Sequence, residues 1–335
     1  MKKLKLFVSL SLFFIVKINA QFYGHKLYDY STLPPVIPPS LIASSAYTTG
    51  AYSLGYVNGM YCGSNVNGRA FFARKTDMDG NITTVDDFFR NFKVYKNTSC
   101  IAGLNTNVPN CAGVTVIETA IGAPTNGSRY ALVAALNGPS SGNFLVFATL
   151  DQSGNLVNTA FYDFPANVSG IRKPVIAESA SAPGNYYICG SYFLPAGETM
   201  YALKVNINGA ITWSQTYFSG ADIEPRALIE SPHSPTELII VGRVEPDPNQ
   251  PPFLARVDDG FFLKLSAAAG NIILFNVYGE DLVLGEHQGF SSVAPAFSTF
   301  GGSFGFVIGG FSEALSNSPM AKGTWMLKVD QNGTH

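Results

Sequence analysis

Charged side chains are scarce in this chain. Asp, Glu, Lys and Arg make up 13% of its 335 residues, and the formal net charge is −2. The chain has neither a basic run nor an acidic tail, which argues against nucleic acid and anionic membranes as partners. Its four histidines are scattered, without the spacing of a zinc site. No G-x-S-x-G elbow, P-loop or dinucleotide fingerprint is present, so the sequence predicts no catalytic residue and no nucleotide cofactor.

Long apolar runs are also missing beyond the first twenty residues, so we expect no transmembrane segment. Residues 1–20 start with lysines, continue through the apolar stretch Leu6–Val16 and end on the small residue Ala20. This pattern is typical of a secretory signal peptide. We therefore expect a mature chain from Gln21 that is secreted or held at the cell surface, with the periplasm as a further possibility.

Cysteine is limited to four residues: Cys62, Cys100, Cys111 and Cys189. Export would place them where disulfides persist. Cys100 and Cys111 bracket a short polar segment that is easily bridged, and we expect a disulfide between them. Cys62 (MYCGS) and Cys189 (YICGS) occupy the same place in two different repeats, so we interpret both as buried free thiols.

The chain does contain a sequence repeat that occurs five times. Each copy has an apolar strand, a Gly-centred turn and a second strand, in that order. The turn glycines are Gly80, Gly154, Gly209, Gly270 and Gly333. A unit repeated about every 60 residues must stack on copies of itself to bury its apolar face. All-β units of this size predict a β-propeller, here with five blades of four antiparallel strands.

The five blades are expected at residues 40–90, 114–164, 172–220, 225–280 and 290–335, within a single domain of residues 21–335. In the first blade we expect the second strand at Leu54–Cys62. The last blade lacks a fourth strand. The aromatic stretch Phe22–Tyr30 resembles the fourth strands elsewhere, so residues 21–30 are expected to complete the last blade and close the ring. The competing interpretation is a truncated chain with further blades missing.

The repeats resemble a known family, the third most clearly, while Phe261–Gly279 and Thr324–Gly333 match nearly as well. Tyr201–Gly220 (YALKVNINGAITWSQTYFSG) resembles the bacterial secreted β-propeller repeats of the pattern F-V-A-K-L-N-x-x-G-x-L-x-Y-S-T-Y-L-G-G. Gly184–Gly190 (GNYYICG) corresponds to the strand that precedes this pattern. The resemblance implies a propeller and export. It implies no shared activity, because the repeat motif is structural.

Three repeats end their first strand on a carboxylate, and these residues are the candidate site: Glu118, Glu178 and Glu230. In a propeller the first strands surround the axis, so the three side chains would form a ring that could hold a calcium ion or a polar ligand. The alternative is structural. Each glutamate would accept backbone hydrogen bonds in its turn, or pair with a nearby arginine such as Arg172 or Arg226.

The leading functional hypothesis is an exported, monomeric, non-catalytic binding or scaffolding module for an unknown protein or carbohydrate. The alternative is a carbohydrate-active enzyme or lectin with acidic residues at the mouth of the axial channel. A fragment of a larger surface protein is a third possibility.

Overall fold

The computed structural model describes an all-β chain. It covers residues 52–57, 60–65, 71–75, 95–96, 99–100, 110–119, 127–138, 142–151, 156–172, 174–219, 222–245, 259–279, 288–296, 305–312 and 323–335. All of these belong to the second of two units, Leu33–His335, the first being Met1–Thr32. The expected signal peptide and the closing segment 21–30 lie outside the described residues. No helix among the described residues is long and apolar enough to cross a membrane.

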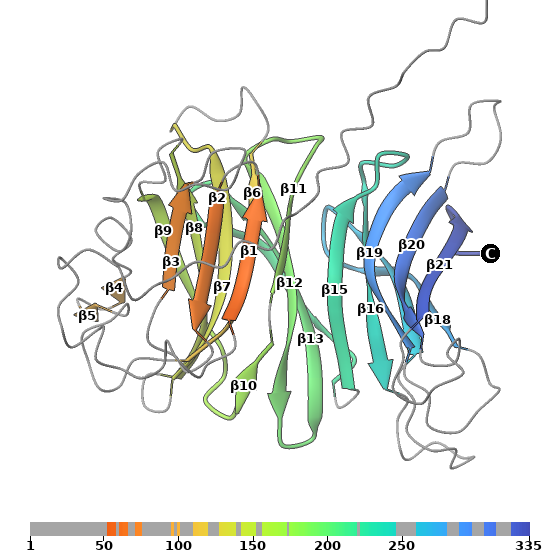
Figure 1. The fold of residues 1–335 in the computed structure, drawn as a ribbon, viewed down its shortest axis with the longest axis horizontal. Helices are drawn as coiled ribbons and strands as arrows, with labels where there is room; N and C mark the ends of the chain where they lie inside the picture. The colour runs from red at the N-terminus through yellow and green to blue at the C-terminus, as the bar shows by residue number, and fades with distance from the viewer. Residues whose placement is uncertain are drawn as a thin grey trace, which may run out of the picture. The chain divides into compact units, whose positions relative to one another are not determined.

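Three sheets in the middle of the chain hold four or five antiparallel strands (Figure 1). The second sheet comprises β6 (Asn110–Glu118), β7 (Tyr130–Gly138), β8 (Gly142–Leu150) and β9 (Leu156–Asp163). The third comprises β10 (Gly170–Ile171), β11 (Val175–Glu178), β12 (Asn185–Leu194), β13 (Gly197–Asn206) and β14 (Ile211–Tyr217). The fourth comprises β15 (Asp222–Glu230), β16 (Glu237–Glu245), β17 (Asp259–Ser266) and β18 (Ile272–Tyr278). Sheets of four antiparallel strands are thus confirmed for these three repeats, and the third sheet has the short additional strand β10.

The outer sheets have three described strands each. The first sheet comprises β1 (Tyr52–Val57), β2 (Met60–Asn65) and β3 (Phe71–Lys75), and the fifth comprises β19 (Gln288–Ala296), β20 (Gly305–Ser312) and β21 (Gly323–Asp330). A small ribbon pairs β4 (Tyr95–Lys96) with β5 (Ser99–Cys100).

The single strand expected at Leu54–Cys62 is wrong, because two antiparallel strands share this stretch. Val57 of β1 pairs with Met60 of β2, so only Asn58 and Gly59 link them. Asn-Gly is the dipeptide that two-residue β-hairpins favour, since both positions need a positive φ. The apolar residues on either side therefore belong to a hairpin.

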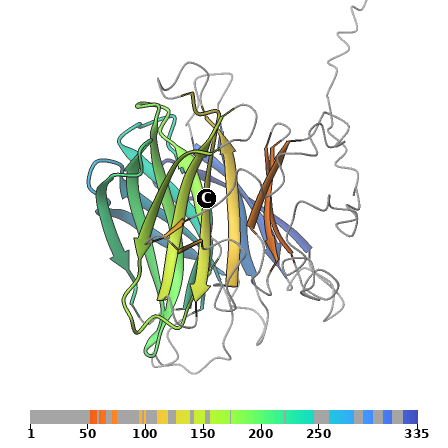
Figure 2. The ribbon, with the colours of Figure 1, turned by 90° about the vertical axis from the view of Figure 1, so that its left-hand side faces the viewer.

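Successive sheets adjoin through their first strands. β1 lies against β6, β6 against β11, β11 against β15, and β15 against β19. The strands β6, β11, β15 and β19 can be followed in this order across Figure 1, and Figure 2 shows the same sheets from the side. The ends of these four first strands are consequently brought near one another, although they lie far apart in the sequence.

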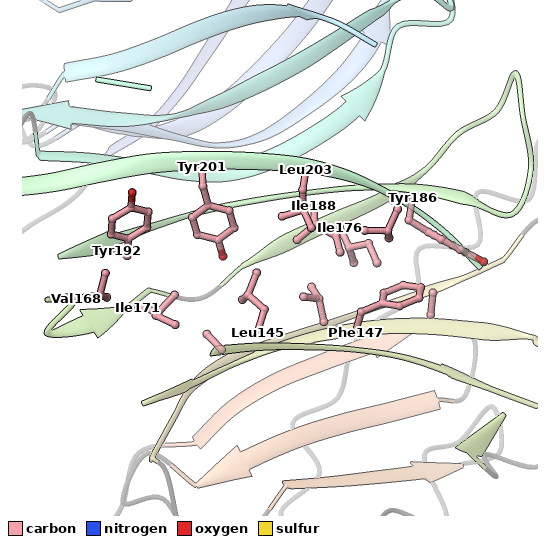
Figure 3. Packing of buried hydrophobic residues seen from close by; sticks show 14 residues of the cluster. Leu145, Phe147, Val168, Ile171, Ile176, Tyr186, Ile188, Tyr192, Tyr201 and Leu203 are labelled. Carbon is pink, nitrogen blue, oxygen red and sulfur yellow. The ribbon is translucent and has the colours of Figure 1, made fainter. Parts of the chain in front are cut away.

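A large apolar cluster fills the space between the second and third sheets (Figure 3). Small side chains such as Ala131 and Ala135 on β7 allow the large rings of Tyr186 and Tyr201 to enter from the third sheet. Phe147 lies against Tyr186, with 5.3 Å between the ring centroids. Fully burying one such side chain stabilises the fold by about 1.5–3 kcal/mol, so this cluster fixes how the two sheets stack.

Candidate functional site

The three glutamates named from the sequence all end a first strand, as expected, and each has protein partners. Glu118, at the end of β6, forms an ion pair with Arg129, the residue just before β7. Glu178, at the end of β11, accepts a 2.9 Å hydrogen bond from the backbone N–H of Gly184 in its own turn. These contacts correspond to the structural alternative considered for this ring of carboxylates.

Glu230 joins two sheets. It ends β15 of the fourth sheet, and its side chain reaches the turn after β11 of the third. Its Oε1 accepts hydrogen bonds from the hydroxyls of Ser179 (2.9 Å), Ser181 (2.8 Å) and Tyr187 (3.3 Å), and its Oε2 accepts one from the Ser181 N–H at 3.0 Å. A buried carboxylate requires such donors, so these contacts give Glu230 a role in holding the two sheets together.

No metal-binding arrangement accompanies these residues in the part of the chain that the structure describes. There, no group of three or more His, Cys, Asp or Glu side chains is placed to hold a metal ion. The calcium hypothesis for Glu118, Glu178 and Glu230 therefore gains no geometric support.

A different cluster of charges lies at the opposite ends of the strands. Arg172, just before β11, forms a bidentate ion pair with Glu198 at the start of β13: Nε lies 2.5 Å from Oε1 and Nη2 lies 3.1 Å from Oε2. Ser191 on β12 also donates a hydrogen bond to Oε1. The Glu198 side chain is only 1% exposed, whereas that of Arg172 is 31% exposed.

The second part of this cluster belongs to the fourth sheet. Glu224, near the start of β15, accepts hydrogen bonds at the same oxygen, Oε2, from Arg226 Nη2 (3.0 Å) and Arg243 Nε (2.7 Å). Arg243 is the β16 residue paired with Glu224 across the sheet. We call Arg172, Glu198, Glu224, Arg226 and Arg243 together the arginine–glutamate network.

The two carboxyl groups of the network differ in pKa. Burial raises the pKa of Glu198, and this effect exceeds the opposing one of its contacts with Arg172 and Ser191. Burial also acts to raise the pKa of Glu224, but hydrogen bonds from Arg226 and Arg243 outweigh it, so this pKa is lowered. Each group is sensitive to the other part of the network, because Glu224 acts on Glu198 and Arg172 acts on Glu224.

Aromatic rings and a glycine set the positions of the arginines. The Arg172 guanidinium lies 4.8 Å from the centre of the Phe193 ring, and that of Arg226 lies 5.3 Å from the centre of the Phe311 ring. Gly289, at the start of β19, leaves room here, because a Cβ atom on it would lie 3.2 Å from the Cβ of Arg243 and 3.3 Å from the Phe311 ring. Residues of the third, fourth and fifth sheets thus meet at this end of the first strands.

With three guanidinium groups and two carboxylates, the network has a net positive charge in a chain whose net charge is −2. Its arginine side chains stay 24–31% exposed. The planar fork of an arginine suits two oxygens of one anion. The network can therefore bind a carboxylate or another oxyanion.

From the sequence, Arg172 and Arg226 were predicted only as possible partners of the first-strand glutamates. Glu198 and Glu224 were not predicted as site residues. Both residues lie within strands of a chain that has few charges. Glu198 is the only carboxylate of β13, but β15 carries Asp222 and Glu230 besides Glu224, so no local pattern set Glu224 apart. The order of the sheets was needed to show that they are neighbours.

The cysteines were predicted from spacing alone. Cys189 on β12 is a free thiol and is fully buried, as expected. Cys62 lies on β2, also the second strand of its sheet, and pairs with Ala73 as Cys189 pairs with Ala202. The side chains of Cys62, Cys100 and Cys111 lie outside the described part of the structure, so the disulfide stays a prediction.

Comparisons with known proteins add little. No family model matches the chain, and no curated protein matches it. Among solved structures, an alpha-L-arabinofuranosidase from Fusarium graminearum in complex with an iminosugar inhibitor has a TM-score of 0.46 at 11% identity, covering 82% of this chain and 80% of that one. The Dos1 propeller has a TM-score of 0.39 at 9% identity, covering 78% and 65%. A bifunctional GH43-CE protein of Bacteroides eggerthii has 0.38 at 10%, covering 83% and 32%.

Proposed function

We propose that the chain is an exported, non-catalytic, carbohydrate-binding β-propeller of five blades, and that the arginine–glutamate network is its ligand site. The five sheets are the blades, and their adjoining first strands are the strands nearest the axis. The residues that end or begin these strands then surround the two mouths of the axial channel. Residues 1–20 are the signal peptide that directs export, and the mature chain acts as a monomer.

One observation carries this proposal: three partly exposed arginines lie near the same end of the first strands, where the buried Glu198 holds one of them. Arg172 uses both Nε and Nη2 on Glu198, so its position is fixed before a ligand arrives. Arg226 contacts Glu224 through Nη2, and Nη1 lies beside Gly289. A preorganised donor set loses little entropy on binding. The ligand that suits it is a carbohydrate bearing carboxylates, such as a polymer of uronic acid.

The test is a calorimetric titration of the mature protein with oligogalacturonate, with a neutral dextran oligomer of similar length as the control ligand. We expect binding of the first ligand only. Arg226→Met is expected to weaken it at least about tenfold, the loss of one charge-assisted hydrogen bond. Arg129→Met is the matched control, because Arg129 is 31% exposed, comparable to the 24% of Arg226, but pairs with Glu118 at the opposite mouth. Equal affinity for both oligomers, or equal effects of the two variants, would overturn the proposal.

A carbohydrate-active enzyme is the second candidate, and one observation favours it. The pKa of Glu198 is raised by burial, as that of a general acid must be. Glu224, whose pKa is lowered, would be the second carboxylate. Hydrolysis of aryl glycosides or of oligogalacturonate by the wild type, lost in Glu198→Gln, would support this candidate. Binding without hydrolysis supports the leading one.

A further inference from the structure

Ser191 on β12 contacts both members of the Arg172–Glu198 pair. Its hydroxyl donates a hydrogen bond to Glu198 Oε1, and its backbone carbonyl accepts one of 2.9 Å from the Arg172 N–H. The Arg172 guanidinium also lies over the Phe193 ring. The backbone of Arg172 is therefore fixed beside Glu198, while its guanidinium stays partly exposed.

The two oxygens of Glu198 are bonded unequally. Oε1 accepts hydrogen bonds from Ser191 Oγ and Arg172 Nε, whereas Oε2 accepts one from Arg172 Nη2, at 3.1 Å, within the described residues. A proton that binds to Glu198 is therefore best accommodated on Oε2, the oxygen with fewer donors. The bond between Nε and Oε1 is then retained, so Arg172 keeps its place when Glu198 loses its charge.

Polar and charged groups from three elements face Glu198 in the part of the chain that the structure describes. Arg172 belongs to the link between β10 and β11, Ser191 to β12, and Glu224 to β15 of the fourth sheet. Glu224 is itself paired with the two other arginines of the network. A change in the charge of Glu198 therefore acts on both parts of the network.

Burial decides which carboxyl group changes its charge first. The Glu198 side chain is only 1% exposed, so water screens its charge little. Burial raises the pKa of Glu198, its contacts with Arg172 and Ser191 oppose this, and the charge of Glu224 adds to the rise. The pKa of Glu224 is lowered, so Glu224 stays ionised. The network then has a net charge of +1 with Glu198 ionised and +2 with Glu198 protonated.

We propose that Glu198 is a pH-sensitive regulator of the arginine–glutamate network, and that its protonation makes the network bind anionic carbohydrate more tightly. This rests on the proposed function, because it assigns a regulation to the same site. The coupling is reciprocal. A carboxylate that binds beside Arg172 favours the neutral form of Glu198, and the neutral form favours the bound carboxylate. Ligand binding should therefore be accompanied by proton uptake.

Calorimetric titrations of the mature protein with oligogalacturonate at pH 5.5 and pH 8 test this regulation. Carboxyl groups with an ordinary pKa of about 4 stay ionised across this range, so the ligand keeps its charge. We expect the affinity to be at least about tenfold higher at pH 5.5. The heat of binding should also vary with the ionisation enthalpy of the buffer, because a proton is taken up. Binding with equal affinity at both pH values would overturn the proposal.

Glu198→Gln imitates the protonated carboxyl group in shape and charge. At pH 8 it should bind about as tightly as the wild type does at pH 5.5, and its affinity should not depend on pH. Glu224→Gln is the matched control, since it removes the other carboxylate of the network. It should bind more tightly at both pH values and keep the pH dependence. Loss of this dependence in Glu224→Gln, or its persistence in Glu198→Gln, would contradict the role of Glu198.

Ser191→Ala gives a second test that keeps Glu198 in place. The hydrogen bond from Ser191 lowers the pKa of Glu198, so its loss should move the rise in affinity to higher pH. An unchanged pH profile in this variant would count against the proposal.

A measurement without ligand separates this inference from the proposed function. In ¹⁵N NMR spectra of the free protein, the Arg172 Nε signal should change between pH 5.5 and pH 8, and this change should be absent in Glu198→Gln. If Arg172 gives no such change, the regulation fails even where oligogalacturonate binds. If the change is present and oligogalacturonate binds at neither pH, the proposed function fails while the proton-sensitive pair is supported.

Discussion

Gly209 and Ala160 approach each other so closely that a Cβ atom on Gly209 would lie 2.2 Å from the Cβ of Ala160. Gly209 is in the turn after β13 of the third sheet, and Ala160 is on β9 of the second. The turn glycine therefore has two requirements. Its φ of +77° favours glycine, and its missing side chain lets two sheets meet.

Replacing two glycines that both have a positive φ separates these two requirements. Gly127 has a similar φ of +80°, but nothing lies within 4 Å of a Cβ placed on it. Gly127→Ala should lower the free energy of unfolding by about 1 kcal/mol, the cost of a left-handed conformation for alanine. Gly209→Ala carries the same strain plus the clash with Ala160, so we expect a loss of about 3 kcal/mol. Urea denaturation of both variants measures this, and similar losses would show that sheet contact at Gly209 is unimportant.

The sequence repeat made most of the fold predictable. Gly209, Gly270 and Gly333 follow apolar third strands, and their positive φ values are those expected for turn glycines. The split of Leu54–Cys62 into two strands was missed, although Asn58-Gly59 is a local signal for a hairpin. There, an apolar stretch on both sides of the turn resembled one continuous strand.

The candidate site was much less predictable. Glu230 was identified, but its partners Ser179 and Tyr187 come from another repeat, so its role followed only from the stacking of sheets. Arg172 lies between β10 and β11, Glu198 lies on β13, and Glu224 lies on a different sheet. Single charges carry no spacing pattern, because their proximity arises from the register and order of sheets.

The two network carboxylates should give opposite dependences of stability on pH. Burial raises the folded-state pKa of Glu198, so the folded state binds a proton more tightly there than the unfolded state does. Stability from this group falls as the pH rises from its usual pKa to the raised one. For Glu224 the folded-state pKa is lowered, chiefly because hydrogen bonds from Arg226 and Arg243 outweigh burial, so stability falls as the pH drops from the usual pKa through the lowered one.

Urea unfolding between pH 3 and pH 7 would measure both effects. In the wild type, Glu198 makes the free energy of unfolding fall as the pH rises, and Glu198→Gln should abolish this contribution. Glu224 makes the free energy of unfolding rise with pH, and Glu224→Gln should abolish that contribution. Changes of the same sign in the two variants would contradict this account of the network.

Glu230 should behave as a structural residue. Glu230→Ala leaves the buried hydroxyls of Ser179 and Tyr187 without this acceptor, so we expect a loss of about 2–4 kcal/mol. Thermal unfolding with added CaCl₂ or with EDTA should give the same melting temperature for the wild type, because protein donors surround this carboxylate. A rise with calcium that disappears in the variant would instead support the cation site expected from the sequence.

The Cys189 thiol should be unreactive in the folded protein. The thiol is fully buried between the third and fourth sheets, and burial raises its pKa above the usual value, so almost no thiolate is present at neutral pH. Iodoacetamide should therefore label Cys189 only after unfolding in guanidinium, whereas mass spectrometry of the native protein should find it unmodified. The same digest, left unreduced, tests the predicted Cys100–Cys111 disulfide. Labelling of Cys189 at the rate of a free peptide thiol would mean that the third and fourth sheets separate readily, and that the cluster around Tyr187, Ile240 and Leu263 does not hold them together.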